Sequence, residues 1–143
     1  MPALGAAEAR ARFAASPIAR LATADAAGRP HLVPVVFVVD GDLVATAVDH
    51  KPKRSPRLRR LADIRANPAV SLLVDRYDDD WDRLWWARAD GRARVLPPAA
   101  DSPEAARWTA LLVAKYPRHY AGRPPVGEVV EARITAWTGW HAT

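Results

Sequence analysis

The stretch LVATAVDHKPKRSPRLRRLADIRANP, residues 43–68, decides how the rest of the chain is arranged. It begins as a strand and continues into a loop that carries Lys51, Lys53 and Arg54. Because Pro52 keeps this loop out of helical geometry, two lysines one residue apart are expected to point the same way from an extended segment. The pattern predicts an anion site at the end of a strand.

The helix that follows the basic loop is expected to complete this anion site. Ser55 stands where an N-cap belongs, and Pro56 stands at the first helical position. Such a helix directs its free N–H groups and its positive dipole end at a bound anion, typically a phosphate. A solvated basic loop before a surface helix is the alternative interpretation. The residues expected to be buried on this helix are Leu58, Leu61, Ala62 and Ile64.

The composition is that of an ordinary single domain. The chain has 143 residues, of which 50% are hydrophobic and 26% are charged, enough for a sizeable core. It has no cysteine, which excludes disulfides, thiolate catalysis and cysteine metal sites. The longest apolar run, residues 32–39, is much shorter than the ~20 residues of a membrane helix, and no secretory signal opens the chain. We expect a cytoplasmic protein, without membrane attachment, that forms one domain over residues 1–143.

The excess of positive charge admits two kinds of partner. The chain has 21 Lys and Arg against 16 Asp and Glu, a net charge of +5. The arginines are scattered and locally balanced by aspartates, as in residues 75–82, and no nucleic-acid-binding motif is present. We therefore expect an anionic small molecule and no nucleic acid. The acidic residues 75–82 lack the glycine and glutamate of a calcium loop, and no metal site is expected there.

The remaining patterns predict an α+β fold, a mainly antiparallel six-stranded barrel with short flanking helices. Strands are expected at residues 18–23, 31–39, 43–47, 69–74, 84–96 and 126–140, and helices at residues 2–15, 56–66 and 103–116. The proline-rich residues 117–125 are expected to form a loop. The second strand is apolar on both faces, and its Pro34 lacks an N–H, which predicts a bulge or an edge position.

The strand at residues 84–96 shows clean alternation between two faces. Small and apolar side chains occupy one face, whereas Trp86 stands on the other among charged residues. A bulky aromatic is not needed for a core on that face. Trp86 beside Arg88 therefore indicates an interface or ligand contact, with a packed surface aromatic as the alternative.

The order of these elements, together with three segments, resembles the pyridoxamine-phosphate-oxidase-like split β-barrel family of flavin and deazaflavin oxidoreductases. The segments are residues 18–54, 58–75 and 83–95. Within that family the chain is similar to the branch that uses coenzyme F420, a deazaflavin. Members are homodimers that bind the cofactor in a groove between subunits, so the resemblance implies a homodimer with a small-molecule substrate.

The resemblance assigns Lys51, Lys53 and Arg54 to the cofactor phosphate. It assigns the main chain of Val33, Pro34, Val35 and Val36 to the ring. Thr46 and Trp86 are assigned further cofactor contacts, and that of Trp86 reaches across the subunit interface. Oxidases of the pyridoxamine phosphate type carry an arginine at the position of Val33. Its absence weakens both FMN binding and that oxidase activity as interpretations.

The activity implied by the resemblance is hydride transfer between reduced F420 and a small organic substrate, with the protein orienting the ring. An FMN-dependent oxidoreductase stays open as an alternative. So does a non-catalytic protein that binds a flavin, a deazaflavin or haem, because a fold does not fix a function. Possible proton donors are His31, His50, Tyr77, His119 and Tyr120, and none is assigned a catalytic role.

Overall fold

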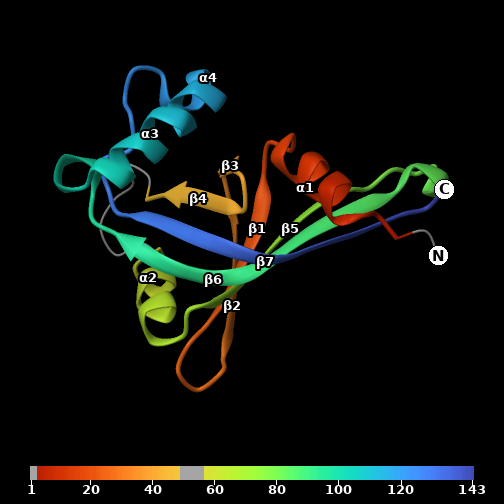
Figure 1. The fold of residues 1–143 in the computed structure, drawn as a ribbon, viewed down its shortest axis with the longest axis horizontal. Helices are drawn as coiled ribbons and strands as arrows, with labels where there is room; N and C mark the ends of the chain where they lie inside the picture. Colours follow the sequence, from red (N-terminus) through yellow and green to blue (C-terminus); the bar gives the residue numbers. More distant parts are fainter. Residues whose placement is uncertain (1–2, 49–56) are drawn as a thin grey trace.

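The structure is a computed structural model that describes residues 3–48 and 57–143 (Figure 1). Within these residues, seven strands form one antiparallel sheet with flanking helices, which confirms the expected α+β class. The strands are β1 (Ala19–Ala24), β2 (Pro30–Val35), β3 (Val38–Asp40), β4 (Leu43–Ala47), β5 (Ala69–Arg76), β6 (Trp85–Leu96) and β7 (Val129–His141). The helices are α1 (Ala6–Ala14), α2 (Arg57–Ala66), α3 (Pro103–Lys115) and α4 (Pro117–Tyr120), with 3₁₀ turns at Trp81–Arg83 and Ala99–Asp101.

The sheet curls into a split barrel. Its strand order is β2-β1-β5-β6-β7-β4-β3, so β2 and β3 occupy its two edges although they follow one another in the chain. Only Val36 and Phe37 separate them, and three Cα steps span at most about 10 Å. The two edges must therefore lie close together, and the fully buried Phe37 fills the crossing between them.

The single strand expected at residues 31–39 is wrong, because the chain forms two strands there, β2 and β3. The sheet therefore has seven strands in place of six. The chain has to pass from one edge of the sheet to the other, which an unbroken strand cannot do. The edge position expected for Pro34 is confirmed, because β2 is an edge strand that pairs only with β1 among the described strands.

Helix α1 covers one face of the sheet, called here the inner face, at the level of β6 and β7 (Figure 1). Its buried residues are Ala9 and Phe13. The Phe13 ring lies 4.8 Å from the Phe37 ring and 5.5 Å from the Trp137 ring, centre to centre. A helix with a weakly apolar face is thus anchored mainly by one aromatic side chain.

Helix α3 forms a second core at the other end of the sheet. Ser102 caps it by accepting a hydrogen bond from the Ala105 N–H at 3.2 Å, as the sequence predicts. Trp108 and Leu112 are fully buried. The Trp108 Nε1–H donates to Glu131 Oε2 at 2.7 Å, so this carboxylate on β7 is buried beneath the helix and hydrogen-bonded.

Two details of the helices differ from the sequence-based expectation. On α2, Leu61 and Ile64 are buried as expected, but Ala62 is exposed and Asp63 is buried in its place. The expected burial of Leu58 falls on a side chain outside the described residues. The loop expected at residues 117–125 begins with helix α4, because a proline at its first position fixes a helical φ.

Strands β6 and β7 pair along their whole length, and the alternation expected for β6 is confirmed, with Ala87, Ala89 and Ala93 buried. The register shifts between Asp90 and Gly91, where β7 has one extra residue, as in a β-bulge. A Cβ atom at Gly91 would lie 2.0 Å from the Arg133 carbonyl oxygen, so the two strands approach closely only because this residue is glycine. No helix within the described part of the chain is long and apolar enough to cross a membrane.

Candidate functional site

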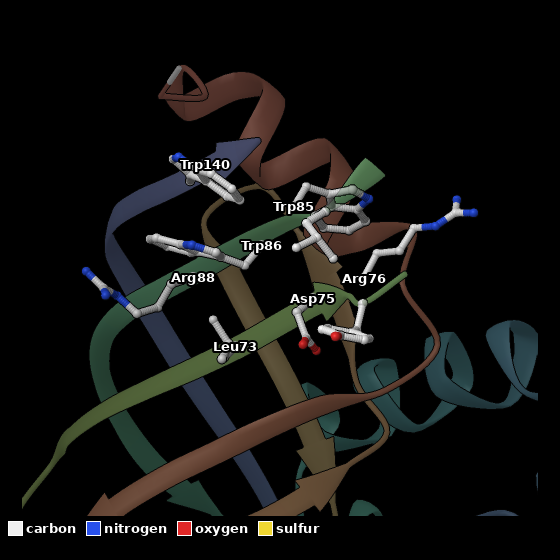
Figure 2. A pocket seen from close by; sticks show the side chains of 9 residues that line it. Leu73, Asp75, Arg76, Trp85, Trp86, Arg88 and Trp140 are labelled. Atoms are coloured by element: carbon white, nitrogen blue, oxygen red, sulfur yellow. The ribbon is translucent and has the colours of Figure 1, made fainter. Parts of the chain in front are cut away.

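A pocket of about 310 Å³ opens on the outer face of the sheet, opposite α1, at the ends of β5, β6 and β7 (Figure 2). We call it the tryptophan pocket. It is lined by Leu73, Asp75, Arg76, Tyr77, Leu84, Trp85, Trp86, Arg88 and Trp140. A second pocket of about 410 Å³ lies next to it and shares Leu73 and Asp75. The two pockets form one continuous concave stretch across the outer face from β1 to β7.

The register of the strands builds the tryptophan pocket. Trp86 on β6 stands directly opposite Trp140 on β7 and opposite Asp75 on β5. Arg88 belongs to the next row, and its guanidinium carbon lies 5.5 Å from the centre of the Trp86 ring (Figure 2). The alternation of three neighbouring strands thus brings two indole rings and a cation to one place.

Two polar atoms beside this pocket have no partner within the described residues. Trp140 Nε1 and Thr138 Oγ1 are both buried without a hydrogen bond. They are two residues apart on β7, so both belong to the outer face. Buried polar groups are nearly always hydrogen-bonded in native proteins. Because both atoms are buried, a ligand or a second protein surface reaches them only if the neighbouring side chains move.

The two arginines of the pocket pair with carboxylates that lie outside its lining. Arg88 Nε lies 2.8 Å from Asp90 Oδ2, and the Arg76 guanidinium lies 3.8 Å from Asp78 Oδ2. The rest of the pocket lining is mainly apolar and aromatic, with few polar groups, which is the usual chemistry of a small-molecule site. The residues present fit a flat ring system that stacks on indole.

The predicted cofactor residues divide into three groups in the structure. Trp86 lines the tryptophan pocket, and Pro34 shares the outer face with it, in the same cross-strand row as Leu73 and Arg88. Val35 and Thr46 are buried. Val33 and Val36 are partly buried, each packed against one of the two cores. Lys51, Lys53 and Arg54, together with their N-cap Ser55, lie outside the described residues, so the anion site stays a prediction.

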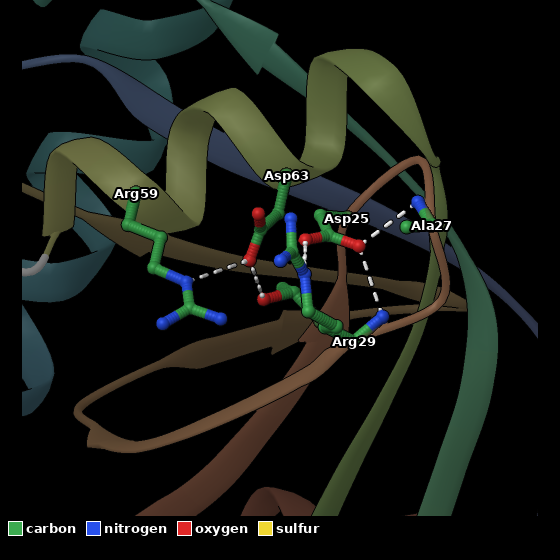
Figure 3. A network of polar contacts seen from close by, with 6 residues as sticks. Asp25, Ala27, Arg29, Arg59 and Asp63 are labelled. Carbon is green, nitrogen blue, oxygen red and sulfur yellow. Dashed lines mark hydrogen bonds and ion pairs between the residues drawn. The ribbon is translucent and has the colours of Figure 1, made fainter.

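The helix that follows the basic segment is fixed to β1 by a buried polar network (Figure 3). Asp63 on α2 is buried, and its Oδ2 accepts a hydrogen bond from Thr23 Oγ1 at 3.0 Å. The Arg59 Nε lies 3.9 Å from the same oxygen. Sequence reasoning missed Asp63, although an acidic residue directly before the buried Ile64 was a usable signal.

The β1–β2 hairpin next to this network has its own carboxylate. Asp25 Oδ1 accepts hydrogen bonds from the backbone N–H groups of Ala27 and Arg29, both at 2.9 Å, and Oδ2 accepts from Arg29 Nε at 2.7 Å (Figure 3). These bonds, that of the Arg29 backbone foremost, lower the pKa of Asp25 below its usual range. Gly28 closes the turn with a φ of 80°.

Sequence reasoning also missed the partners of Trp86 in the pocket. Trp140 and Tyr77 carry no motif, and only the pairing of β6 with β7 places the second indole opposite the first. The five possible proton donors are scattered in the structure as far as it describes them, and of these only Tyr77 lines the tryptophan pocket. Within residues 3–48 and 57–143 no group of three His, Asp or Glu side chains is placed to hold a metal ion.

Solved structures of the same fold come from several bacteria. An FAD-binding protein from Mesorhizobium loti has a TM-score of 0.73 and 21% identity, with 96% of this chain and 95% of that chain covered. An FAD-binding protein from Mycobacterium smegmatis has a TM-score of 0.61 and 22% identity, covering 98% and 97%. The haem storage protein HutZ from Vibrio cholerae has a TM-score of 0.70 and 16% identity, covering 96% and 95%. At these identities the likeness shows the fold alone.

No curated protein matches the sequence significantly. The family model described as pyridoxamine 5'-phosphate oxidase matches residues 6–141, nearly the whole chain. This match agrees with the curled antiparallel sheet and with the folds of the solved structures. The chain belongs to the pyridoxamine 5'-phosphate oxidase-like split-barrel family.

Proposed function

We propose that the protein is a homodimeric oxidoreductase that binds a flavin-type tricyclic cofactor, foremost coenzyme F420, and transfers a hydride between it and a small organic substrate. The observation that carries this proposal is the tryptophan pocket, which presents two opposed indole rings and the Arg88 guanidinium on an outer sheet face. A pocket of about 310 Å³ is at the lower end of the usual range for small-molecule sites.

The residues of the chain would bind and orient the ring. Trp86 and Trp140 offer apolar faces for stacking. The cofactor itself supplies the hydride chemistry, and the protein supplies position and exclusion of water. No general acid or base has to be assigned for this role.

The proposal of a homodimer is supported by the apolar character of the outer face. Leu32 on β2 and Leu73 on β5 are exposed there and line the pocket beside the tryptophan pocket. A contiguous exposed apolar patch of this kind favours association with another surface. A second copy of this chain would cover Leu32 and Leu73 and place its own residues over the cofactor.

The choice of F420 over FMN or FAD is supported by the basic segment of the sequence. Lys51, Lys53 and Arg54 suit a cofactor with a long anionic tail. Val33 stands where the oxidases carry an arginine that helps to bind the flavin phosphate, which speaks against FMN. FAD is the ligand named for two of the solved structures, so it belongs in the same test.

The test is a fluorescence titration of the purified protein with F420, FMN and FAD, using the cofactor signal. We expect F420 to bind in the micromolar range or tighter, and Trp86→Ala to weaken it at least tenfold. Trp81→Ala is the matched control, because Trp81 is exposed and does not line the tryptophan pocket. Lys53→Ala is also expected to weaken F420 binding, because it removes a cation from the predicted phosphate site and leaves the tryptophan pocket unchanged.

Each outcome of the titration decides one part of the proposal. Binding of FMN or FAD alone would replace the deazaflavin by a flavin. An unchanged dissociation constant in Trp86→Ala would remove the tryptophan pocket as the ring site. Tight binding without oxidation of the reduced cofactor by any member of a substrate panel would favour a storage or carrier protein. Binding of none of the three would overturn the proposal.

A further inference from the structure

We infer that Arg92 and Arg133, assisted by Arg94, form a second anion-binding site for a small dianion of the phosphate-ester or pyrophosphate type. The site lies on the outer face of β6 and β7, six residues along β6 from Trp86. At about 3.3 Å per residue, roughly 20 Å separates it from the tryptophan pocket. The inference stands independently of the proposed cofactor and its chemistry.

The first observation is the register of the two arginines. Arg92 on β6 stands directly opposite Arg133 on β7. Their neighbours on the other sides are Ala69 on β5 and Leu43 on β4, so no carboxylate stands opposite either one. Like charges at directly opposed positions destabilise a strand pair. The pairing of β6 with β7 therefore gives no structural reason for two opposed arginines.

The second observation is the contrast with the other arginines. Eleven arginines among the described residues lie within 4.0 Å of a carboxylate. They are Arg10, Arg12, Arg20, Arg29, Arg59, Arg65, Arg76, Arg83, Arg88, Arg94 and Arg107. Arg92 and Arg133 have no such partner in residues 3–48 and 57–143, and they stand directly opposite each other. Arg118 and Arg123 also lack a described carboxylate partner, but neither lies in a strand, whereas Arg92 and Arg133 share one row of the sheet.

The third observation is a pocket between these side chains. A concave region of about 500 Å³ is lined by Pro68, Arg92, Ala93, Arg94, Glu131 and Arg133. Its one carboxylate is already used, because Glu131 Oε1 accepts from Arg94 Nε at 3.0 Å and Oε2 accepts from Trp108 Nε1 at 2.7 Å. Three arginines and one glutamate give the lining a formal charge of about +2 at neutral pH.

The chemistry of the lining selects the ligand. Two guanidinium groups side by side can each donate two parallel hydrogen bonds to a tetrahedral oxyanion, a geometry that phosphate groups satisfy and halides do not. A dianion would neutralise the formal charge and remove the repulsion between Arg92 and Arg133. Arg94 is held by Glu131 and by Glu104, at 2.7 Å from the latter. These two carboxylates offset its charge, so Arg94 fixes one wall of the pocket while Arg92 and Arg133 supply the unpaired cations.

The test uses inorganic pyrophosphate as the probe, titrated by isothermal calorimetry at low ionic strength into the whole protein without cofactor. The titration is made in Lys53→Ala, so that the predicted phosphate site after β4 does not contribute. In that background we expect saturable binding, at least tenfold weaker after Arg92→Gln or Arg133→Gln and absent after both. Arg92→Lys is expected to bind with an intermediate affinity, because it keeps the charge and loses the paired donors.

The matched control is Arg118→Gln, an exposed arginine on α4 that pairs with no described carboxylate and lies outside the pocket. It removes the same charge and is expected to change the affinity less than twofold. A second readout is thermal unfolding. Removing one of two repelling charges is expected to raise the Tm of the free protein slightly, while the rise in Tm caused by pyrophosphate disappears.

Three results would overturn the inference. The first is equal affinity in the double variant and the Lys53→Ala parent. The second is an equal loss after Arg118→Gln, which would show that net charge alone attracts the probe. The third is complete loss of binding in Lys53→Ala itself, which would place pyrophosphate at the basic segment and leave the proposed cofactor site intact.

Discussion

Leu72 and Leu73 are consecutive residues of β5 with the same side chain and opposite surroundings. Leu72 faces the inner core and is 2% exposed, whereas Leu73 faces outward and is 37% exposed, at the border of both outer pockets. The inner face meets small and aliphatic side chains beneath α1, and the outer face carries indoles and arginines. At the level of β5, the sheet thus packs a core with its inner face and leaves its outer face open, although the outer face packs against α3 at the other end of the sheet. The following variants test that division.

The largest effect is expected for Gly91→Val, where the two long strands approach most closely. A Cβ atom at this position would lie 2.0 Å from the Arg133 carbonyl oxygen, and backbone cannot move as a side chain can. We expect a loss of about 3 kcal/mol or more in the free energy of unfolding, or failure to fold. Chemical denaturation measures it, with Gly5→Ala as the control because nothing lies within 4 Å of that position. Equal stability of the two variants would contradict the close approach.

The pair Leu72→Ala and Leu73→Ala tests the two faces directly. Leu72→Ala is expected to cost about 2–5 kcal/mol, the usual range for deleting a fully buried leucine. Leu73→Ala should cost less than about 1 kcal/mol in dilute protein, because little packing is lost. If a second copy covers the outer face, the cost of Leu73→Ala will grow with protein concentration. A cost independent of concentration would speak against that dimer surface.

Thr23→Val tests the polar attachment of α2 to β1. The change keeps the shape of the side chain and removes the hydroxyl that donates to the buried Asp63 Oδ2 at 3.0 Å, whereas the Arg59 Nε lies 3.9 Å from that oxygen. We expect a cost of about 1–3 kcal/mol for a buried acceptor left without its partner. The control is Thr135→Val, which removes an exposed hydroxyl bound to the Asp90 carbonyl. If both variants lose equally little stability, the network in Figure 3 contributes no more than a surface hydrogen bond.

The last test concerns the pH dependence of stability at Lys115, the last residue of α3. Burial lowers the pKa of Lys115 to about 8, against 10.5 for an ordinary lysine. Its Nζ donates to the Ala14 and Ser16 carbonyls at 3.1 and 3.0 Å and lies 3.8 Å from the centre of the Phe37 ring, contacts that favour the charged form and limit the shift.

The sign of this effect follows from the lowered pKa. Between about pH 8 and 10.5 the unfolded chain binds a proton that the native chain has lost, so stability should rise with pH across that window. Below about pH 8 both states carry the proton, and the contribution is constant. Urea unfolding of the protein and of Lys115→Met at several pH values measures the slope. The slope should be smaller in Lys115→Met, and an unchanged slope would assign it to other groups.

Most of the fold could be predicted from the sequence because its signals are local. Alternation in β6, the Ser102 cap and the hairpin at Gly28 each depend on residues near one another in the chain. The break at Val36 and Phe37 could not be predicted this way. A continuous apolar run is compatible with one strand or two, and only the closure of the sheet decides between them.

The candidate site was predictable in part for the same reason. Trp86 stood out because an aromatic on a charged face breaks the local pattern, and the structure places it in the tryptophan pocket. Trp140 and the opposed pair Arg92 and Arg133 depend on which residue of β7 meets which residue of β6. One extra residue in β7 shifts that register between Asp90 and Gly91, and no local sequence pattern predicts this shift.

The position of β7 in the sheet has a consequence for how the chain folds as it leaves the ribosome. Among the described strands, β7 alone pairs with both β6 and β4, so it joins β2-β1-β5-β6 to the β4-β3 hairpin. Residues 43–47 can pair with β7 only after residues 129–133 have been synthesised. This pairing joins segments far apart in the sequence and is therefore slow to form. Until then both edges of β4-β3 and the free edge of β6 are exposed, and the growing chain is at its most vulnerable to pairing with another copy.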